Sequence, residues 1–363
     1  MRFIIAVVFV FFITGSCTKR DKELTNKESA EIHFNMGNEY LRVGDDKKAM
    51  EEWYKAKELD PANTRYLNNI ATIIYNQGKR EEALKLWEQL LSSPPTVMEA
   101  TYAIINIGNY YKDKKEWTKA MEYYERAVKT SPNYFMSYYN IGLLYYEKGD
   151  MEKAEANFKK SISLSNKDAH SHYYLGNIYR ERGKLDDAFA EWQRATSMYE
   201  KFYLPRYEMA NYYFMNGKIE DAIKEYKTII NIEPDNPDFA SIYANLGFLL
   251  IDTNKPDEAE KTFKKGREIN KDKEKDFYFL DGLGWLNYKK GNYEESIKIL
   301  EDAVKNTPPD NIQFLANEHY HIGMVYISIG KKNIARQNLE KAMQLNKDKR
   351  FIADIKGILS KLS

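Results

Sequence analysis

Histidine is the residue type in this chain that most readily suggests metal chemistry, because it occurs in two His-x-His pairs. The pairs are His170 with His172 and His319 with His321. On a helix, residues two apart point to nearly opposite sides, whereas metal-binding histidines sit four apart and share a face. We therefore predict that these histidines pack within helices, and we expect neither a metal site nor any other cofactor.

Four Gly-Lys pairs resemble fragments of a phosphate-binding loop. They lie at 78–79, 183–184, 217–218 and 330–331. None has the full glycine-rich spacing followed by serine or threonine that cradles a phosphate. The sequence also contains no nucleophile elbow, zinc-protease motif or kinase signature. We predict that the protein is not an enzyme and takes no small-molecule substrate. An active site assembled from residues far apart in the sequence is the alternative.

The elements that would position any such side chains follow from a repeated alanine. It recurs as Ala49, Ala83, Ala120, Ala154, Ala188, Ala222, Ala259 and Ala335, with Ser296 in the same register. Neighbouring members of this series are 34 to 39 residues apart. A fixed period near 34 indicates a solenoid, in which each unit buries its apolar face only by stacking on a neighbour.

The residue types within each period point to a known family. The first unit has Met36, Gly37, Tyr40, Gly44, Ala49, Trp53, Ala56 and Pro61. In type and spacing these residues resemble the tetratricopeptide repeat family, whose units are pairs of antiparallel helices. We place the units at 30–63, 64–97, 101–134, 135–168, 169–202, 203–236, 240–273, 277–310 and 316–349. The resemblance implies an all-α fold, a right-handed superhelical solenoid of about nine repeats, followed by a capping helix at 350–363.

Glycines and short insertions give more local predictions, with each place counted from the first residue of its unit. A glycine or alanine at place eight lets two helices approach closely. Seven glycines at place fifteen fit a left-handed residue that ends the first helix, and they are Gly44, Gly78, Gly149, Gly183, Gly217, Gly291 and Gly330. The insertions at 98–100, 237–239, 274–276 and 311–315 are predicted to lengthen turns between units, which loops tolerate well.

The resemblance also implies that the first helix of each unit lines a concave groove. Asparagines recur there at places six and nine, as Asn35, Asn69, Asn106, Asn140 and Asn245, and as Asn38, Asn109, Asn177 and Asn211. Tyrosines at place five are Tyr139, Tyr173 and Tyr207. A carboxamide can pair with both sides of a peptide bond, so these residues are predicted to bind an extended peptide or protein segment. The alternative is that the asparagines serve helix packing or are only family consensus.

The N-terminus reads as an export signal. Arg2 precedes an apolar run at 3–13, which is too short for a membrane-spanning helix, and this order describes a signal peptide over 1–16. The segment resembles a bacterial lipoprotein signal, which implies cleavage before Cys17 and a lipid on its sulfur. Residues 17–29 would form a flexible tether. An ordinary cleaved signal or a short uncleaved anchor is the alternative.

The balance of charge bears on the partners. The formal net charge is +1, and a balanced surface lacks the clustered basic face that nucleic acids require. We predict a non-catalytic protein–protein interaction scaffold, tethered to a membrane of the bacterial cell envelope, with the outer membrane favoured. The alternatives are a pilotin-like or outer-membrane protein assembly factor acting as a complex subunit, and an adaptor that recruits cell-wall enzymes.

Overall fold

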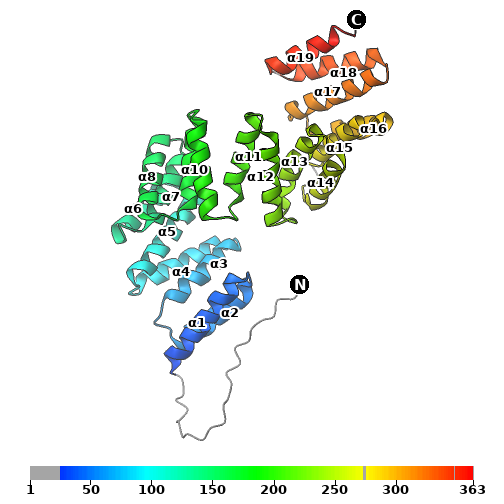
Figure 1. Cartoon of the computed structure of the whole chain (residues 1–363). Helices are drawn as coiled ribbons and strands as arrows, with labels where there is room; N and C mark the ends of the chain where they lie inside the picture. Colours follow the sequence, from blue (N-terminus) through cyan, green and yellow to red (C-terminus); the bar gives the residue numbers. More distant parts are fainter. Residues whose placement is uncertain (1–24, 273–274, 347, 363) are drawn as a thin grey trace, which may run out of the picture. The chain divides into compact units, whose positions relative to one another are not determined.

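The structure is a computed structural model that describes residues 25–272, 275–346 and 348–362. Within these ranges it consists of nineteen α-helices and one 3-10 helix, without a strand, which confirms the predicted all-α class (Figure 1). No helix in these ranges is both long enough and apolar enough to span a membrane. The predicted signal peptide and Cys17 lie outside the described residues.

The chain divides into two compact units, 1–148 and 149–363. In the first, the helices are α1 (Asn26–Arg42), α2 (Asp46–Leu59), α3 (Arg65–Asn76), α4 (Arg80–Ser92), α5 (Val97–Asp113), α6 (Trp117–Thr130) and α7 (Phe135–Glu147). The second begins with α8 (Met151–Leu164), α9 (Ala169–Glu181), α10 (Leu185–Met198), α11 (Tyr203–Met215), α12 (Ile219–Ile232) and the 3-10 helix η1 (Pro237–Phe239). It continues with α13 (Ala240–Asp252), α14 (Pro256–Ile269), α15 (Phe277–Lys289), α16 (Tyr293–Asn306), α17 (Ile312–Ser328), α18 (Lys332–Leu345) and α19 (Lys349–Leu359).

Within each unit the helices pack in chain order. The first and second helices of a repeat contact each other, as α1 with α2 and α9 with α10, and the second helix of one repeat packs on the first of the next, as α4 on α5. This arrangement buries apolar side chains between neighbouring helices of a unit, such as Leu90 of α4 and Ala195 of α10.

Two of the four insertions do not lengthen turns, contrary to the prediction. Residues 98–100 lie inside α5, and 312–315 begin α17. At α5 the cause is a capping box: the Glu99 amide donates to Thr96 Oγ1 at 3.3 Å, and the Thr96 amide donates to Glu99 Oε2 at 2.8 Å. The insertion at 237–239 instead forms η1. The first helix of a repeat can therefore grow by a turn at its N-terminal end.

The predicted left-handed glycines are confirmed. All seven have a positive φ, from 71° at Gly217 to 86° at Gly78. In the two repeats without this glycine, Lys115 and Asn254 occupy the same place with φ values of 59° and 57°. The turn between the two helices thus requires a left-handed residue in every repeat, whichever side chain is present.

Glycine at place eight makes room for a ring within its own repeat. A Cβ added to Gly176 would lie 2.5 Å from Nε1 of Trp192, which is 1% exposed, and 3.0 Å from the Ala188 carbonyl oxygen. Gly37 stands in the same relation to Trp53, at 2.4 Å. The prediction of close approach therefore holds, and the buried ring at place twenty-four is what approaches most closely.

The two ends of the repeat series differ in how they are covered. After the last repeat, α19 buries Ile355 completely against Leu339 and Ala342. On α1, which no described helix precedes, Ile32 and Met36 are 46% and 41% exposed. These occupy places three and seven, and the place-seven residues of the next two repeats, Ile70 and Ile107, are buried.

Candidate functional site

The predicted groove residues come from the first helices of the repeats, α1, α3, α5 and α7 in one unit and α9, α11 and α13 in the other. Their exposure varies. Asn35 is exposed; Asn38, Asn69, Asn106, Asn109, Asn211 and Asn245 are half-buried. Asn140 and Asn177 are only 5% and 4% exposed, so they offer little surface to a ligand.

Three of the four place-nine asparagines accept a hydrogen bond from the ring at place twenty-four; in the first repeat the Trp53 indole donates instead to the Phe34 carbonyl. The Tyr124 hydroxyl donates to Asn109 Oδ1 at 2.7 Å, and the Trp192 indole donates to Asn177 Oδ1 at 3.1 Å. The Tyr226 hydroxyl donates to Asn211 Oδ1 at 2.9 Å. Each asparagine therefore satisfies a donor that would otherwise be buried without a partner.

In the first unit, several place-six asparagines bond to neighbouring groups of the protein. Asn69 Nδ2 donates to Asn38 Oδ1 at 3.3 Å, and Asn106 Nδ2 donates to Asn68 Oδ1 at 3.1 Å. Asn140 Nδ2 donates to the Met136 carbonyl of its own helix at 2.7 Å. The carboxamides of adjacent repeats thus pair with each other, and Asn68 belongs to this row although the repeat pattern did not single it out.

The predicted tyrosines contribute to packing as well as to surface. Tyr139, Tyr173 and Tyr207 are all half-buried. The Tyr173 ring packs edge-on against Phe202, with centroids 5.3 Å apart, and burial raises the pKa of Tyr173. Their rings are therefore already in contact with the protein, and only part of each is available to a partner.

A pocket of about 200 Å³ lies in the second unit between α11, α12 and α13. Its lining residues are Asn211, Phe214, Tyr226, Asn245, Phe248 and Leu249. Asn211 and Asn245 were predicted as groove residues. The sequence reasoning missed the apolar ones, although Phe248 stands at place nine and Phe214 lies on the same first helix, α11, as Asn211.

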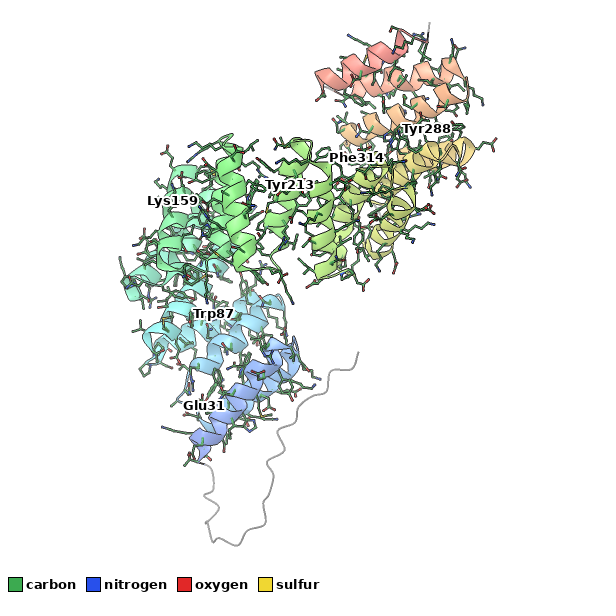
Figure 2. All side chains as sticks on the ribbon, in the orientation of Figure 1. Glu31, Trp87, Lys159, Tyr213, Tyr288 and Phe314 are labelled. Atoms are coloured by element: carbon green, nitrogen blue, oxygen red, sulfur yellow. The ribbon has the colours of Figure 1, made fainter. Side chains whose placement is uncertain are left out.

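The pocket combines an apolar interior with two carboxamides. Leu249 and Tyr226 are nearly buried, whereas Phe214 is 51% exposed. The Tyr226 hydroxyl donates to Asn211 Oδ1, and burial raises the pKa of Tyr226. The hydroxyl therefore stays protonated at neutral pH and holds the Asn211 carboxamide, while Asn245 lines the same pocket. Figure 2 shows the side chains of this region, with Tyr213 of α11 labelled.

The charged side chains of the groove are paired with opposite charges. Lys112 Nζ lies 3.2 Å from Glu147 Oε1 in the first unit, and Arg180 pairs with Glu208 in the second. Burial raises the pKa of Asp252, an effect that Lys289 and His321 oppose. Such pairing gives no basis for a strongly charged ligand.

Three histidines at place four bridge the two helices of their repeat. His33 Nδ1 lies 2.6 Å from Glu52 Oε2, and His319 Nδ1 lies 2.9 Å from Asn338 Oδ1. His172 pairs with Glu191, which is also nineteen residues further along. This spacing was visible in the sequence and was missed. In the described part of the chain, no group of three or more His, Cys, Asp or Glu side chains could hold a metal ion.

Stacked helix pairs and a left-handed residue at every mid-repeat turn define a helical-repeat protein. Tetratricopeptide repeat models match residues 30–63, 64–93, 108–149, 137–168, 179–246, 240–273, 279–310 and 319–349, which together make up more than half of the chain. The chain belongs to the tetratricopeptide repeat family. The models that match describe repeats and name no enzyme.

The similar proteins are distant in sequence. The chain is 24% identical over 105 residues to anaphase-promoting complex subunit 6 of Arabidopsis thaliana, covering 28% of this chain and 19% of that protein. It is 27% identical over 114 residues to outer dynein arm-docking complex subunit 4 of Homo sapiens, covering 29% and 17%. The chain thus matches less than a fifth of the length of either relative. The APC/C hetero-tetramer Cut9-Hcn1 has a TM-score of 0.51 at 14% identity, over 89% of this chain and 55% of that one, and shares the fold.

Proposed function

We propose that this protein is a non-catalytic scaffold that binds segments of other proteins along the first helices of its repeats. The observation that carries the proposal is the pocket between α11 and α13, where Phe214 is half-exposed beside Asn211 and Asn245. An exposed large apolar side chain next to polar groups with hydrogen-bonding capacity is typical of a protein-binding surface.

The family and its relatives support a role in binding proteins. Tetratricopeptide repeats stack into extended surfaces that contact partners, and the two curated relatives are named as subunits of an anaphase-promoting complex and of a dynein arm-docking complex. We extend to the present chain only the general role of binding other proteins, and we do not propose that it belongs to those complexes.

The N-terminal sequence supports a membrane tether. Gly15 and Ser16 precede Cys17, the only cysteine of the chain, after the apolar run at 3–13. The proposal is therefore a lipid-anchored protein of the bacterial envelope, with the outer membrane favoured. Expression of Cys17→Ser tests this step: the variant should leave the membrane fraction and lack the mass of the lipid, and an unchanged mass and fractionation would contradict lipidation.

A crosslinked pull-down from intact cells tests the binding surface. The groove variant combines Asn35→Arg and Phe214→Arg, both at exposed positions of first helices. The matched control combines Tyr54→Arg and Ile334→Arg, which are exposed on the second helices α2 and α18. Circular dichroism would confirm that both variants fold.

We expect partners to be lost with the groove variant and kept with the control. The reverse result would place binding on the second helices and contradict the proposal. The identity of the partners separates the two narrower roles, because an envelope-assembly subunit would recover assembly proteins and an adaptor would recover cell-wall enzymes.

A further inference from the structure

The basic side chains of this protein are concentrated around its last two helices. Residues 331–361 contain nine basic and three acidic side chains, whereas residues 25–330 contain 42 basic and 49 acidic ones. The net charge of +1 therefore conceals a segment of charge +6 that follows a negatively charged body. We propose that the outer surface of α18 and α19 binds the headgroups of an anionic phospholipid membrane.

Six cations of this segment are unpaired. None of them forms an ion pair among the residues that the structure describes, and they are Lys331, Lys332, Arg336, Lys341, Lys356 and Lys361. Elsewhere in the second unit, lysines are neutralised across repeats: Lys255 Nζ lies 3.0 Å from Glu220 Oε2, and Lys290 Nζ lies 2.6 Å from Glu260 Oε2. The cations of the C-terminal segment therefore keep their attraction for an anion outside the protein.

The packing of α19 leaves its charged side outward. Ile355 is fully buried against Leu339 of α18, so the apolar face of α19 is occupied by the protein itself. Lys356, Gly357 and Lys361 are exposed, and a Cβ added to Gly357 would meet no heavy atom within 4 Å. Because α19 is the last described helix (Figure 1), no later helix of the described chain covers this side.

The type of these cations favours a lipid surface over a single bound anion. Five of the six unpaired cations are lysines. A lysine is a point charge on a flexible stem, whereas bidentate recognition of one phosphate favours the planar fork of arginine. Clusters of roughly four to eight cations on an amphipathic helix bind anionic lipid by charge, and each contributes about fivefold in affinity. The surface therefore has the chemistry to bind a fluid layer of anionic headgroups.

The proposed lipid on Cys17 makes a membrane the partner nearest to these cations. A tethered protein meets a second site on the same surface at a high effective concentration, and a lipid chain combined with a basic surface gives stable attachment. The choice of a membrane rests on that proposed tether. The existence of an anion-binding surface rests only on the unpaired cations.

Co-sedimentation with lipid vesicles tests the inference. Every sample is the full chain carrying Cys17→Ser, so that no acyl chain contributes. Vesicles of phosphatidylcholine measure binding through the apolar run at 3–13, and vesicles that also contain phosphatidylglycerol add negative charge. Lys356→Gln with Lys361→Gln removes two outer cations. The control, Lys224→Gln with Lys261→Gln, makes the same change in net charge at exposed lysines of α12 and α14.

We expect the parent chain to bind the anionic vesicles at least about a hundredfold more tightly than the neutral ones. Raising NaCl from about 0.1 M to about 1 M shortens the Debye length from about 10 Å to about 3 Å and should remove most of this difference. The α19 double variant should lose roughly 25-fold in affinity for the anionic vesicles, at about fivefold per cation. The control should bind like the parent chain, and circular dichroism should show that both variants fold.

Equal binding of the parent chain to the two kinds of vesicle would overturn the inference, and so would equal losses in the α19 variant and the control. Tighter salt-dependent binding to a duplex DNA oligonucleotide than to anionic vesicles would assign the cations to a nucleic acid instead. If the α19 variant kept vesicle binding but lost a salt-dependent self-association in sedimentation velocity, the cations would belong to an interface with a second copy.

The outcomes also separate this inference from the proposed tether. Release of Cys17→Ser from cell membranes, together with a failure to bind anionic vesicles, would support the tether and overturn the inference. Binding to anionic vesicles by a chain whose native Cys17 carries no lipid mass would contradict the tether and support the basic surface.

Discussion

Replacing Gly176 by alanine is expected to destabilise the fifth repeat, although alanine is the better helix former by about 1 kcal/mol. The new Cβ would lie 2.5 Å from Trp192 Nε1 and 3.0 Å from the Ala188 carbonyl oxygen. Overpacking of this kind costs about 1–3 kcal/mol. Displacing the indole would also break its hydrogen bond to Asn177, and a buried N–H without a partner costs about 1–3 kcal/mol. The net loss is about 1–5 kcal/mol.

The matched control is Gly357→Ala in α19. A Cβ there would meet no heavy atom within 4 Å, so helix propensity alone should act and stabilise the protein by about 1 kcal/mol. Urea unfolding followed by circular dichroism measures both changes, and hydrogen exchange of α9 and α10 amides localises the first. If both substitutions stabilised the protein alike, the close packing of Trp192 over Gly176 would be refuted.

Three further predictions concern single features of the repeats. Lys115→Gly should raise the melting temperature, because a non-glycine residue in the left-handed region costs about 1–2 kcal/mol; Asn254→Gly should do so less, and a decrease for Lys115→Gly would contradict the strain. Burial raises the pKa of Glu318 from its ordinary 4.5 to about 8, so wild-type stability should fall as pH rises from 4.5 through 8. This loss of unfolding free energy should reach roughly 4–5 kcal/mol at high pH, and Glu318→Gln should lack it. Urea unfolding of both proteins over this pH range measures the difference, and parallel pH profiles would contradict the prediction. Met36→Ala should cost less than about 1 kcal/mol in urea unfolding, whereas Ile107→Ala at the same place should cost about 2–5 kcal/mol; equal losses would mean that α1 is covered.

The fold could be predicted because burial follows place in the repeat. Ala49, Ala120 and Ala188 are fully buried, since each faces the same neighbours one period apart. The prediction that residues 98–100 lengthen a turn was wrong, although the sequence contains the signal for a helix start. Thr96 and Glu99 have the spacing of a capping box, which marks a helix start and not a longer loop.

The candidate site was harder to predict because a carboxamide's role depends on its partners. Asn140 and Asn177 belong to the same repeat pattern as the exposed Asn35, yet they are buried and hydrogen-bonded within the protein. Which asparagines face a ligand depends on side-chain packing between repeats, which the period alone does not contain. The pocket itself needed Phe214 and Phe248 from adjacent repeats to stand close in space.

The asparagines at place nine (row nine) and those at place six (row six) can now be given different roles. At place nine, asparagine occurs only where place twenty-four is Trp or Tyr, as in Asn177 with Trp192. Repeats with Phe or Leu at place twenty-four have Leu, Phe, Trp or Met at place nine. Asn109, Asn177 and Asn211 are therefore explained by the need to satisfy a buried donor. Asn38 is the exception, because the Trp53 indole donates to the Phe34 carbonyl and Asn38 accepts from Asn69. Repeat two supports this from the other side: Thr72 stands at place nine, and Trp87 Nε1 has no hydrogen-bond partner in the part of the chain that the structure describes.

Row six has no such dependence, so its asparagines are the better candidates for ligand contact. Asn35 occurs in a repeat with Trp53 at place twenty-four, and Asn245 occurs in a repeat with Phe263 there. The Phe263 ring has no N–H or O–H group, so Asn245 is not needed to satisfy a donor. The two rows meet in one pocket, because the Tyr226 hydroxyl donates to Asn211 of row nine and Asn245 of row six lines the same pocket. Substitution of Asn245 therefore tests ligand contact without taking away the acceptor of the buried hydroxyl, whereas substitution of Asn211 changes the packing as well.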